Sequence, residues 1–162
     1  MRGVDEILEA NEAYARAFDR GGLEASPARK LAVVTCMDAR IDPLRLLGLD
    51  LGDAHVIRNA GGLVTDDALR SLALSHWLLG TQEALVIGHT DCGAAAFGND
   101  ELRERVGPAA EGVDFLPVAD VDAAVRAGVR LIEESPLLPA AFGARGFVYD
   151  VADGRLHPVR EF

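Results

Sequence analysis

The chain has 162 residues, of which 49% are hydrophobic and 26% charged, as is usual for one globular domain, here expected over residues 1–162. Its net charge of −10 disfavours nucleic acid and anionic membrane surfaces as partners. No run approaches the roughly 20 apolar residues of a membrane span, and the N-terminus lacks the apolar core of a signal peptide, so we expect a cytoplasmic protein.

The first predicted element is an amphipathic helix over residues 5–19. One side of this helix is expected to carry its apolar residues Ile7, Leu8, Ala15 and Phe18. Gly21-Gly22 is expected to end this helix, which belongs to an N-terminal helical arm over residues 1–30. Three short runs rich in β-branched residues then predict buried strands, at residues 31–35, 54–58 and 84–88.

Two further helices and two late strands complete the predicted order. One helix begins after Thr65, a capping residue, and ends before Gly80. Another is expected over residues 120–134, and strands over 146–151 and 155–159 suggest a terminal hairpin. Strands that alternate with helices predict an α/β fold, with a mostly parallel central sheet flanked by helices.

In such sheets, functional groups gather beyond the carboxyl ends of the strands. Both cysteines of the chain lie there, Cys36 directly after the first strand and Cys92 shortly after the third, where His89 also lies. Two thiolates and an imidazole suit zinc, and three protein ligands leave its fourth position open for catalysis. Buried packing, a thiol–imidazole catalytic pair and a redox pair are the other interpretations of these residue types.

Asp38 and Arg40 follow Cys36 at a spacing of two residues, so their side chains can point the same way in an extended segment. A charged pair beside a strand end is costly to bury unless it is well hydrogen-bonded or has a task. The arginine can hold Asp38 ionised through a bidentate contact. A simple surface ion pair is the alternative interpretation.

Several motifs together resemble those of the β-class carbonic anhydrases. They are Cys36-x-Asp38-x-Arg40, Gly88-His89-x-x-Cys92-Gly93, Arg58-Asn59-Ala60-Gly61-Gly62, Thr65-Asp66-Asp67-Ala68-Leu69 and Gly146-Phe147-Val148-Tyr149-Asp150. The matches run from about Leu31 to the C-terminus, and their combination is far more specific than any one of them.

The resemblance implies one Zn²⁺ per chain, held by Cys36, His89 and Cys92. It also implies reversible hydration of CO₂ to bicarbonate and a proton by a metal-bound hydroxide. Asp38 would either orient that hydroxide or, in a closed state, bind the metal as a fourth ligand, and its pairing with Arg40 would decide between the two. Gly61, Gly62 and Gly93 are candidates for the substrate pocket.

The resemblance further implies a homodimer or a dimer of dimers, in which the N-terminal helix of each chain embraces its partner. A carbonyl sulfide or carbon disulfide hydrolase on the same scaffold is the nearest alternative. A zinc-binding protein without catalysis is an alternative of another class, and the presence of Asp38 and Arg40 argues against it.

Overall fold

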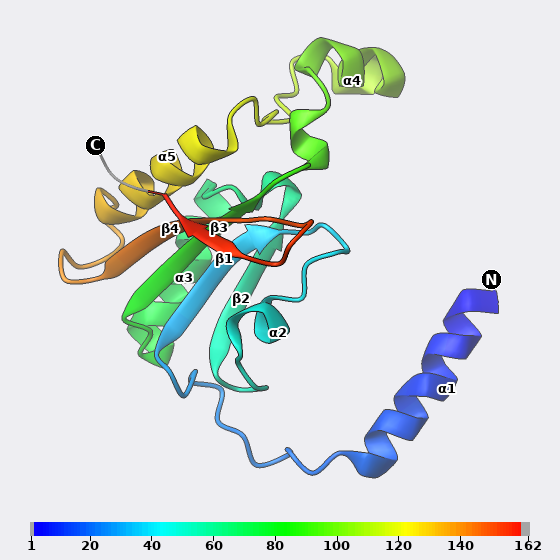
Figure 1. Cartoon of the computed structure of the whole chain (residues 1–162), viewed down its shortest axis with the longest axis vertical. Coiled ribbons are helices and arrows are strands. Elements are labelled where there is room, and N and C mark those ends of the chain that lie inside the picture. The colour runs from blue at the N-terminus through cyan, green and yellow to red at the C-terminus, as the bar shows by residue number, and fades with distance from the viewer. Residues whose placement is uncertain (1, 160–162) are drawn as a thin grey trace.

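The structure, a computed structural model, describes residues 2–159 and is built on one five-stranded sheet (Figure 1). Its spatial order is β2-β1-β3-β4-β5. The first four strands are parallel and β5 is antiparallel to β4, which confirms the predicted α/β fold and the terminal hairpin. The strands are β1 (Leu31–Cys36), β2 (Ala54–Asn59), β3 (Glu83–His89), β4 (Gly143–Tyr149) and β5 (Leu156–Pro158).

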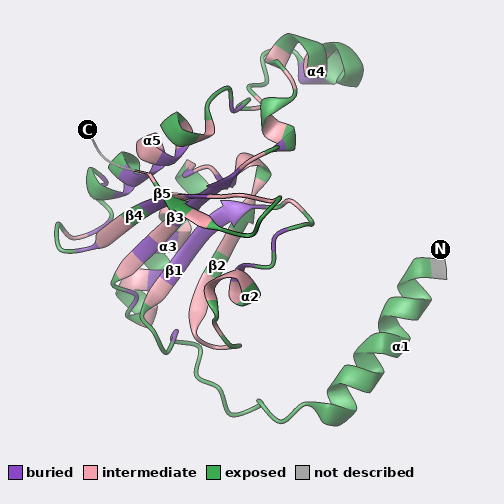
Figure 2. Ribbon diagram, viewed as in Figure 1, coloured by how far each residue is buried: buried purple, intermediate pink, exposed green. Residues whose placement is uncertain are grey.

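The centre of the sheet is its most buried part (Figure 2). Strand β1 lies between β2 and β3, with Thr35 opposite Arg58 on one side and Ile87 on the other. Because β1 is covered on both faces, its sequence is a continuous apolar run rather than an alternating one. The chain crosses from β2 over β1 to reach β3, so the topological switch point lies between β1 and β3.

Two helices pack on the same face of this sheet, α3 (Asp66–Leu79) and α5 (Val121–Glu133). Both helices pack in one core cluster with side chains from every second residue of β1 and β3. These are Ala32 and Val34 of β1, which lie opposite Ala84 and Val86 of β3. Their ends follow the predicted signals. Thr65 and Asp120 accept backbone N–H bonds as N-caps, and Gly80 ends α3 in the left-handed conformation.

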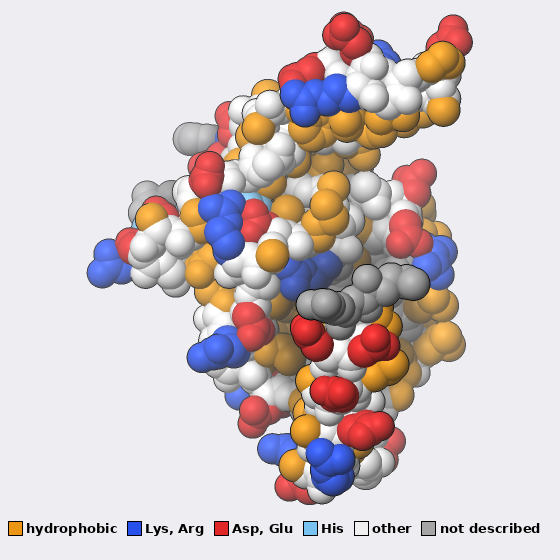
Figure 3. Space-filling model, turned by 90° about the vertical axis from the view of Figure 1, so that its right-hand side faces the viewer, with side chains coloured by type: hydrophobic (Ala, Val, Ile, Leu, Met, Phe, Trp, Pro, Cys, Tyr) orange, Lys and Arg blue, Asp and Glu red, His pale blue; other side chains and the backbone are white. Residues whose placement is uncertain are grey.

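The N-terminal helix α1 (Arg2–Ala17) extends away from the sheet (Figure 1). Every residue from 3 to 26 is exposed, including the apolar side chains of the arm, Val4, Ile7, Leu8, Tyr14 and Phe18. Acidic side chains run along the helix and hydrophobic ones flank them (Figure 3). The predicted range of residues 5–19 was placed slightly too late, since the helix begins at Arg2 and ends at Ala17.

Two short helices were not predicted, α2 (Pro43–Leu47) and α4 (Asn99–Val106). Helix α2 has only five residues, too few to show a helical period, and α4 is polar with no buried residue. Strand β4 begins three residues before the predicted range and ends at Tyr149, because its pairing with β3 starts at Gly143 opposite Glu83. Among the described helices, none has the length and apolarity to cross a membrane.

Candidate metal centre

Three potential ligands meet at the carboxyl edge of the sheet, at its switch point. Cys36 is the last residue of β1, His89 is the last residue of β3, and Cys92 follows in the next turn. All three are buried, and their ligand atoms lie within 4.8 Å of one another. The sequence therefore predicted correctly which residues the fold brings together here.

The imidazole of His89 is held in one tautomer. The residue is 1% exposed, and Nδ1 lies 2.9 Å from the backbone carbonyl of Thr90. Since a carbonyl oxygen only accepts hydrogen bonds, Nδ1 carries the proton and Nε2 presents its lone pair. Nε2 is buried without a hydrogen-bond partner among the described residues, and it belongs to the three-ligand cluster. Such an atom is expected to bind a metal or another donor.

The sulfur atoms also fit a metal. The Sγ atoms of Cys36 and Cys92 are 3.9 Å apart, and both thiols are free. Two Zn–S bonds of about 2.3 Å at a tetrahedral angle would place the sulfurs about 3.8 Å apart, whereas a disulfide requires about 2 Å. Burial raises the pKa of the Cys92 thiol, and the adjacent Cys36 sulfur adds to this. A divalent cation would supply the charge that stabilises the two sulfurs as thiolates.

Asp38 lies beside the cluster and is fixed by Arg40. Its two oxygens accept from Arg40 Nε at 3.0 Å and from Nη2 at 2.8 Å, and Oδ1 also accepts from the backbone N–H of Arg40 at 2.9 Å. These bonds hold the pKa of the Asp38 carboxyl far below its usual range, so the carboxylate is ionised. Asp38 Oδ2 is 4.0 Å from His89 Nε2, which places this carboxylate within reach of the metal position.

Sequence reasoning did not assign a role to Arg58 or Asp91, and both contact this site. Arg58 donates from Nε to the carbonyl of Cys36 at 2.9 Å and from Nη2 to that of Asp38 at 2.7 Å, so it holds the backbone that carries both groups. The Asp91 carboxylate accepts from Arg40 Nη1 at 2.7 Å. Only their positions in the sequence could have indicated a role at the site. Arg58 is close to the end of β2, and Asp91 lies between His89 and Cys92.

The three glycines have different surroundings. Gly62 has φ +66°, and a Cβ there would lie 2.8 Å from the backbone nitrogen of Cys36. Gly61 has φ +79°, and its Cβ would lie 3.0 Å from Val118. Gly93 has open space around it. A tight turn against β1 therefore accounts for Gly62 by itself, and the substrate-pocket role of all three stays a prediction.

Replacing Gly62 by alanine is expected to destabilise the fold by about 3 kcal/mol, from left-handed strain and from overpacking against the backbone of β1. Urea unfolding of the metal-free protein measures this change. Gly93→Ala is the control, because its Cβ meets nothing within 4 Å and no positive φ is needed. Equal stability of the two variants would contradict this account of the turn.

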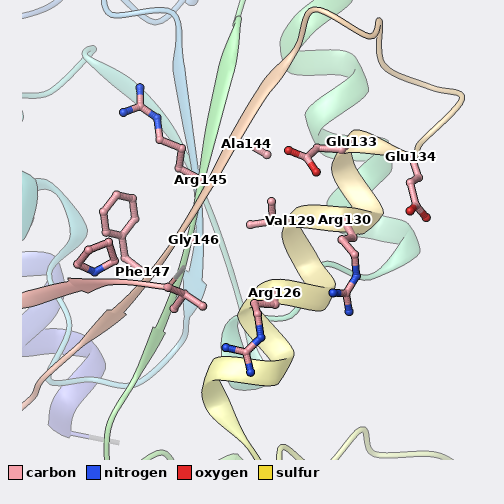
Figure 4. Close-up of a pocket in the computed structure, with 11 residues that line it drawn as sticks. Arg126, Val129, Arg130, Glu133, Glu134, Ala144, Arg145, Gly146 and Phe147 are labelled. Atoms are coloured by element: carbon pink, nitrogen blue, oxygen red, sulfur yellow. The ribbon is translucent and has the colours of Figure 1, made fainter. Parts of the chain in front are cut away.

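Two other features lie outside the Cys–His–Cys cluster. Asp150, Asp153 and His157 bring ligand atoms within 4.8 Å of one another near the β4–β5 turn, but Asp153 and His157 are exposed and Asp153 pairs with Arg155. A groove of about 580 Å³ is lined by residues of α5, of β4 and of the segment at β5 (Figure 4). Its described lining combines arginine, glutamate and apolar side chains, and it includes no residue of the cluster.

The fold and the cluster together define an α/β protein with a candidate metal site at the switch point of the sheet. A family model described as carbonic anhydrase matches residues 31–114. The β-carbonic anhydrase 1 of Mycobacterium tuberculosis is 44% identical, over 98% of this chain and 99% of its own length. The carbon disulfide hydrolase of Acidianus sp. is 35% identical, over 94% of this chain and 87% of its own.

Among solved structures, the crystal structure of carbonic anhydrase from Streptococcus mutans is similar with a TM-score of 0.92 and 43% sequence identity, and the match covers 99% of each chain. The chain belongs to the β-carbonic anhydrase family. The resemblance that the motifs indicated is thereby confirmed.

Proposed function

We propose that this protein is a carbonic anhydrase that catalyses the reversible hydration of CO₂ to bicarbonate and a proton. The observation that carries the proposal is the buried triangle of Cys36, His89 and Cys92 with an ionised Asp38 beside it. The apolar side chains packed around the two cysteines, among them Ile41 and Ala94, suit a small apolar substrate.

One Zn²⁺ per chain would be held by the Sγ atoms of Cys36 and Cys92 and by Nε2 of His89. When bound, zinc lowers the pKa of water to about 7 and so supplies a nucleophile at neutral pH, an effect best known from a carbonic anhydrase with three histidine ligands. Thiolate ligands require reduced cysteines, which supports a cytoplasmic location.

The chain's own groups would orient the reactants. Thr90 fixes the tautomer of His89 through its carbonyl. Asp38, ionised and turned toward Arg40, is an acceptor placed to orient a proton donor at the metal position. Because both of its oxygens accept from Arg40, Asp38 would be held away from a bound metal, and this contact supports the open state over the closed one.

Stopped-flow measurement of CO₂ hydration between pH 7 and 9 tests the proposal, with the protein assayed after zinc loading and again after chelation. Turnover that depends on zinc supports it. The 35% identity to the Acidianus carbon disulfide hydrolase makes CS₂ the alternative substrate. Release of H₂S from CS₂ by zinc-loaded protein that does not hydrate CO₂ would establish that alternative instead.

We also propose that the protein is a single domain and is at least a homodimer. Residues 1–30 would form an arm, and the other residues would form the body of the domain. The arm carries an apolar side that its own chain leaves exposed, and a second copy of the chain would cover it. Tyr14 and Phe18, with ring centroids 5.4 Å apart, belong to that side.

The double variant Ile7→Asp/Leu8→Asp is expected to raise the dimer dissociation constant by at least about 100-fold. Two apolar side chains that lose burial cost about 3 kcal/mol or more together, and 1.4 kcal/mol corresponds to a factor of ten. Light scattering after size exclusion measures the mass. Glu6→Gln/Glu9→Gln, on the polar side of the same helix, is the control and should remain dimeric. A dimer that survives both changes equally would exclude this side of the arm as the interface.

A further inference from the structure

Asp91 contacts the guanidinium of Arg40 on the edge that Asp38 does not occupy. Its Oδ2 accepts from Nη1 at 2.7 Å, and its backbone carbonyl accepts from Nη2 at 2.8 Å. Arg40 gives Nε and the other Nη2 proton to Asp38. The guanidinium of Arg40 is thus held between two aspartates and has little freedom to rotate.

The backbone of Asp91 is in an uncommon conformation. Its φ is +52°, and Lys30 and Leu116 are the other non-glycine residues with positive φ in the part of the chain that the structure describes. This left-handed turn lies between His89 and Cys92, and in it both the side chain and the carbonyl of Asp91 reach Arg40. Strained residues often occur where geometry serves function.

We propose that Asp91 is a positioning residue for the reaction proposed above, and the inference therefore rests on that function. Asp91 fixes the guanidinium of Arg40, and Arg40 in turn keeps Asp38 turned away from the metal position. Asp38 lies close enough to move there, since its Oδ2 is 4.0 Å from His89 Nε2. Losing the second anchor of Arg40 frees Asp38 to become a metal ligand.

The exposure of the charged side chains indicates that the contact between Asp91 and Arg40 orients Arg40 rather than stabilises the fold. The side chain of Asp91 is 81% exposed and that of Arg40 is 46% exposed, whereas that of Asp38 is 16% exposed. An ion pair as exposed as Asp91–Arg40 contributes little to the free energy of unfolding. What the contact provides is order, because a long arginine side chain with a single anchor keeps several rotamers.

Two substitutions of Asp91 distinguish the effect of its hydrogen bond to Arg40 from the effect of its charge. Glycine and asparagine both tolerate a φ of +52°, so neither adds backbone strain. Asp91→Asn keeps a side-chain oxygen that can accept from Arg40 Nη1 and loses only the charge, whereas Asp91→Gly removes the side-chain acceptor and leaves only the backbone carbonyl to accept from Nη2. Asp67→Asn is the matched control, because it alters an exposed carboxylate that pairs with Arg70 within α3.

The experiment combines the visible spectrum of the Co²⁺-substituted protein at pH 7.5 with stopped-flow kinetics of the zinc form. Asp91→Gly is expected to change the cobalt absorption bands, as Asp38 joins the ligands, and to lower kcat about tenfold with KM changed by less than about twofold. Asp91→Asn and Asp67→Asn are expected to retain the parent spectrum and rate.

The spectral change must vanish when Asp91→Gly is placed in an Asp38→Asn background, because the effect is transmitted through Asp38. An unchanged spectrum in Asp91→Gly would overturn the proposal, as would equal effects of Asp91→Gly and Asp91→Asn, or persistence of the change without Asp38. The cobalt spectrum reports the ligands even if the parent protein does not hydrate CO₂, so failure of the proposed function would be recognised separately.

Discussion

The His89→Ala variant is expected to lose its zinc on dialysis and, with it, essentially all CO₂ hydration. His89 supplies the only nitrogen of the cluster, and the two sulfurs alone leave the metal with half of a tetrahedral set. Changes in groups that merely orient a ligand cost about 10- to 100-fold in metal affinity, so removal of a ligand should cost more. Metal analysis after dialysis measures zinc per chain in the variant and the parent.

Because the ring of His89 is buried, a loss of zinc must be distinguished from a loss of fold. Circular dichroism and thermal unfolding of the metal-free parent and variant provide this comparison. His157→Ala is the matched control, since His157 is an exposed histidine of the β4–β5 hairpin. Zinc retained by His89→Ala and lost by His157→Ala would move the metal to the Asp150, Asp153 and His157 group.

The cluster of Cys36, His89 and Cys92 was predictable because one physical rule places its members. Apolar runs end at Thr35 and Gly88, parallel strands bring their carboxyl ends to one edge, and Cys36 and His89 come next in each case. Strand pairing over several residues fixes this arrangement, so an error of one residue in a boundary leaves it intact. The strands β1 and β3 indeed extend one residue beyond the predicted ranges, to include Cys36 and His89 themselves.

The contacts of Arg58 and Asp91 were not predictable in the same way. The Arg58 contacts depend on the direction that a long side chain takes from β2, and the Asp91 contacts depend on the turn after β3. The spacing of residues along the chain does not encode either direction. Asp91 reaches Arg40 from a backbone with positive φ, and no glycine at position 91 predicts that conformation from the sequence. The exposed arm is a related case, since an amphipathic pattern predicts a helix and an apolar side but not what covers that side.

Asp38→Asn is expected to keep zinc and to lower kcat by about 100-fold, within the range found when a group that orients a proton is removed. Asparagine has nearly the same shape, but it cannot accept from both Nε and Nη2 of Arg40 and still point an acceptor at the reacting group. Zinc content should be unchanged, because Asp38 pairs with Arg40 and is not one of the three proposed ligands. Stopped-flow kinetics and metal analysis together measure both quantities.

The pH dependence of this variant gives a further test. Arg40 holds the pKa of Asp38 well below its usual value, so the carboxylate is ionised at every pH from about 6 to 9. Because the pKa of Asp38 in the folded state is lowered, this carboxylate becomes protonated only when the pH falls well into the acid range. Its charge therefore does not change between about pH 6 and 9. The factor by which Asp38→Asn lowers kcat should therefore be the same at both ends of this window. A factor that grows strongly with pH would mean that Asp38 titrates in this window, and that Arg40 does not hold it ionised as the geometry implies.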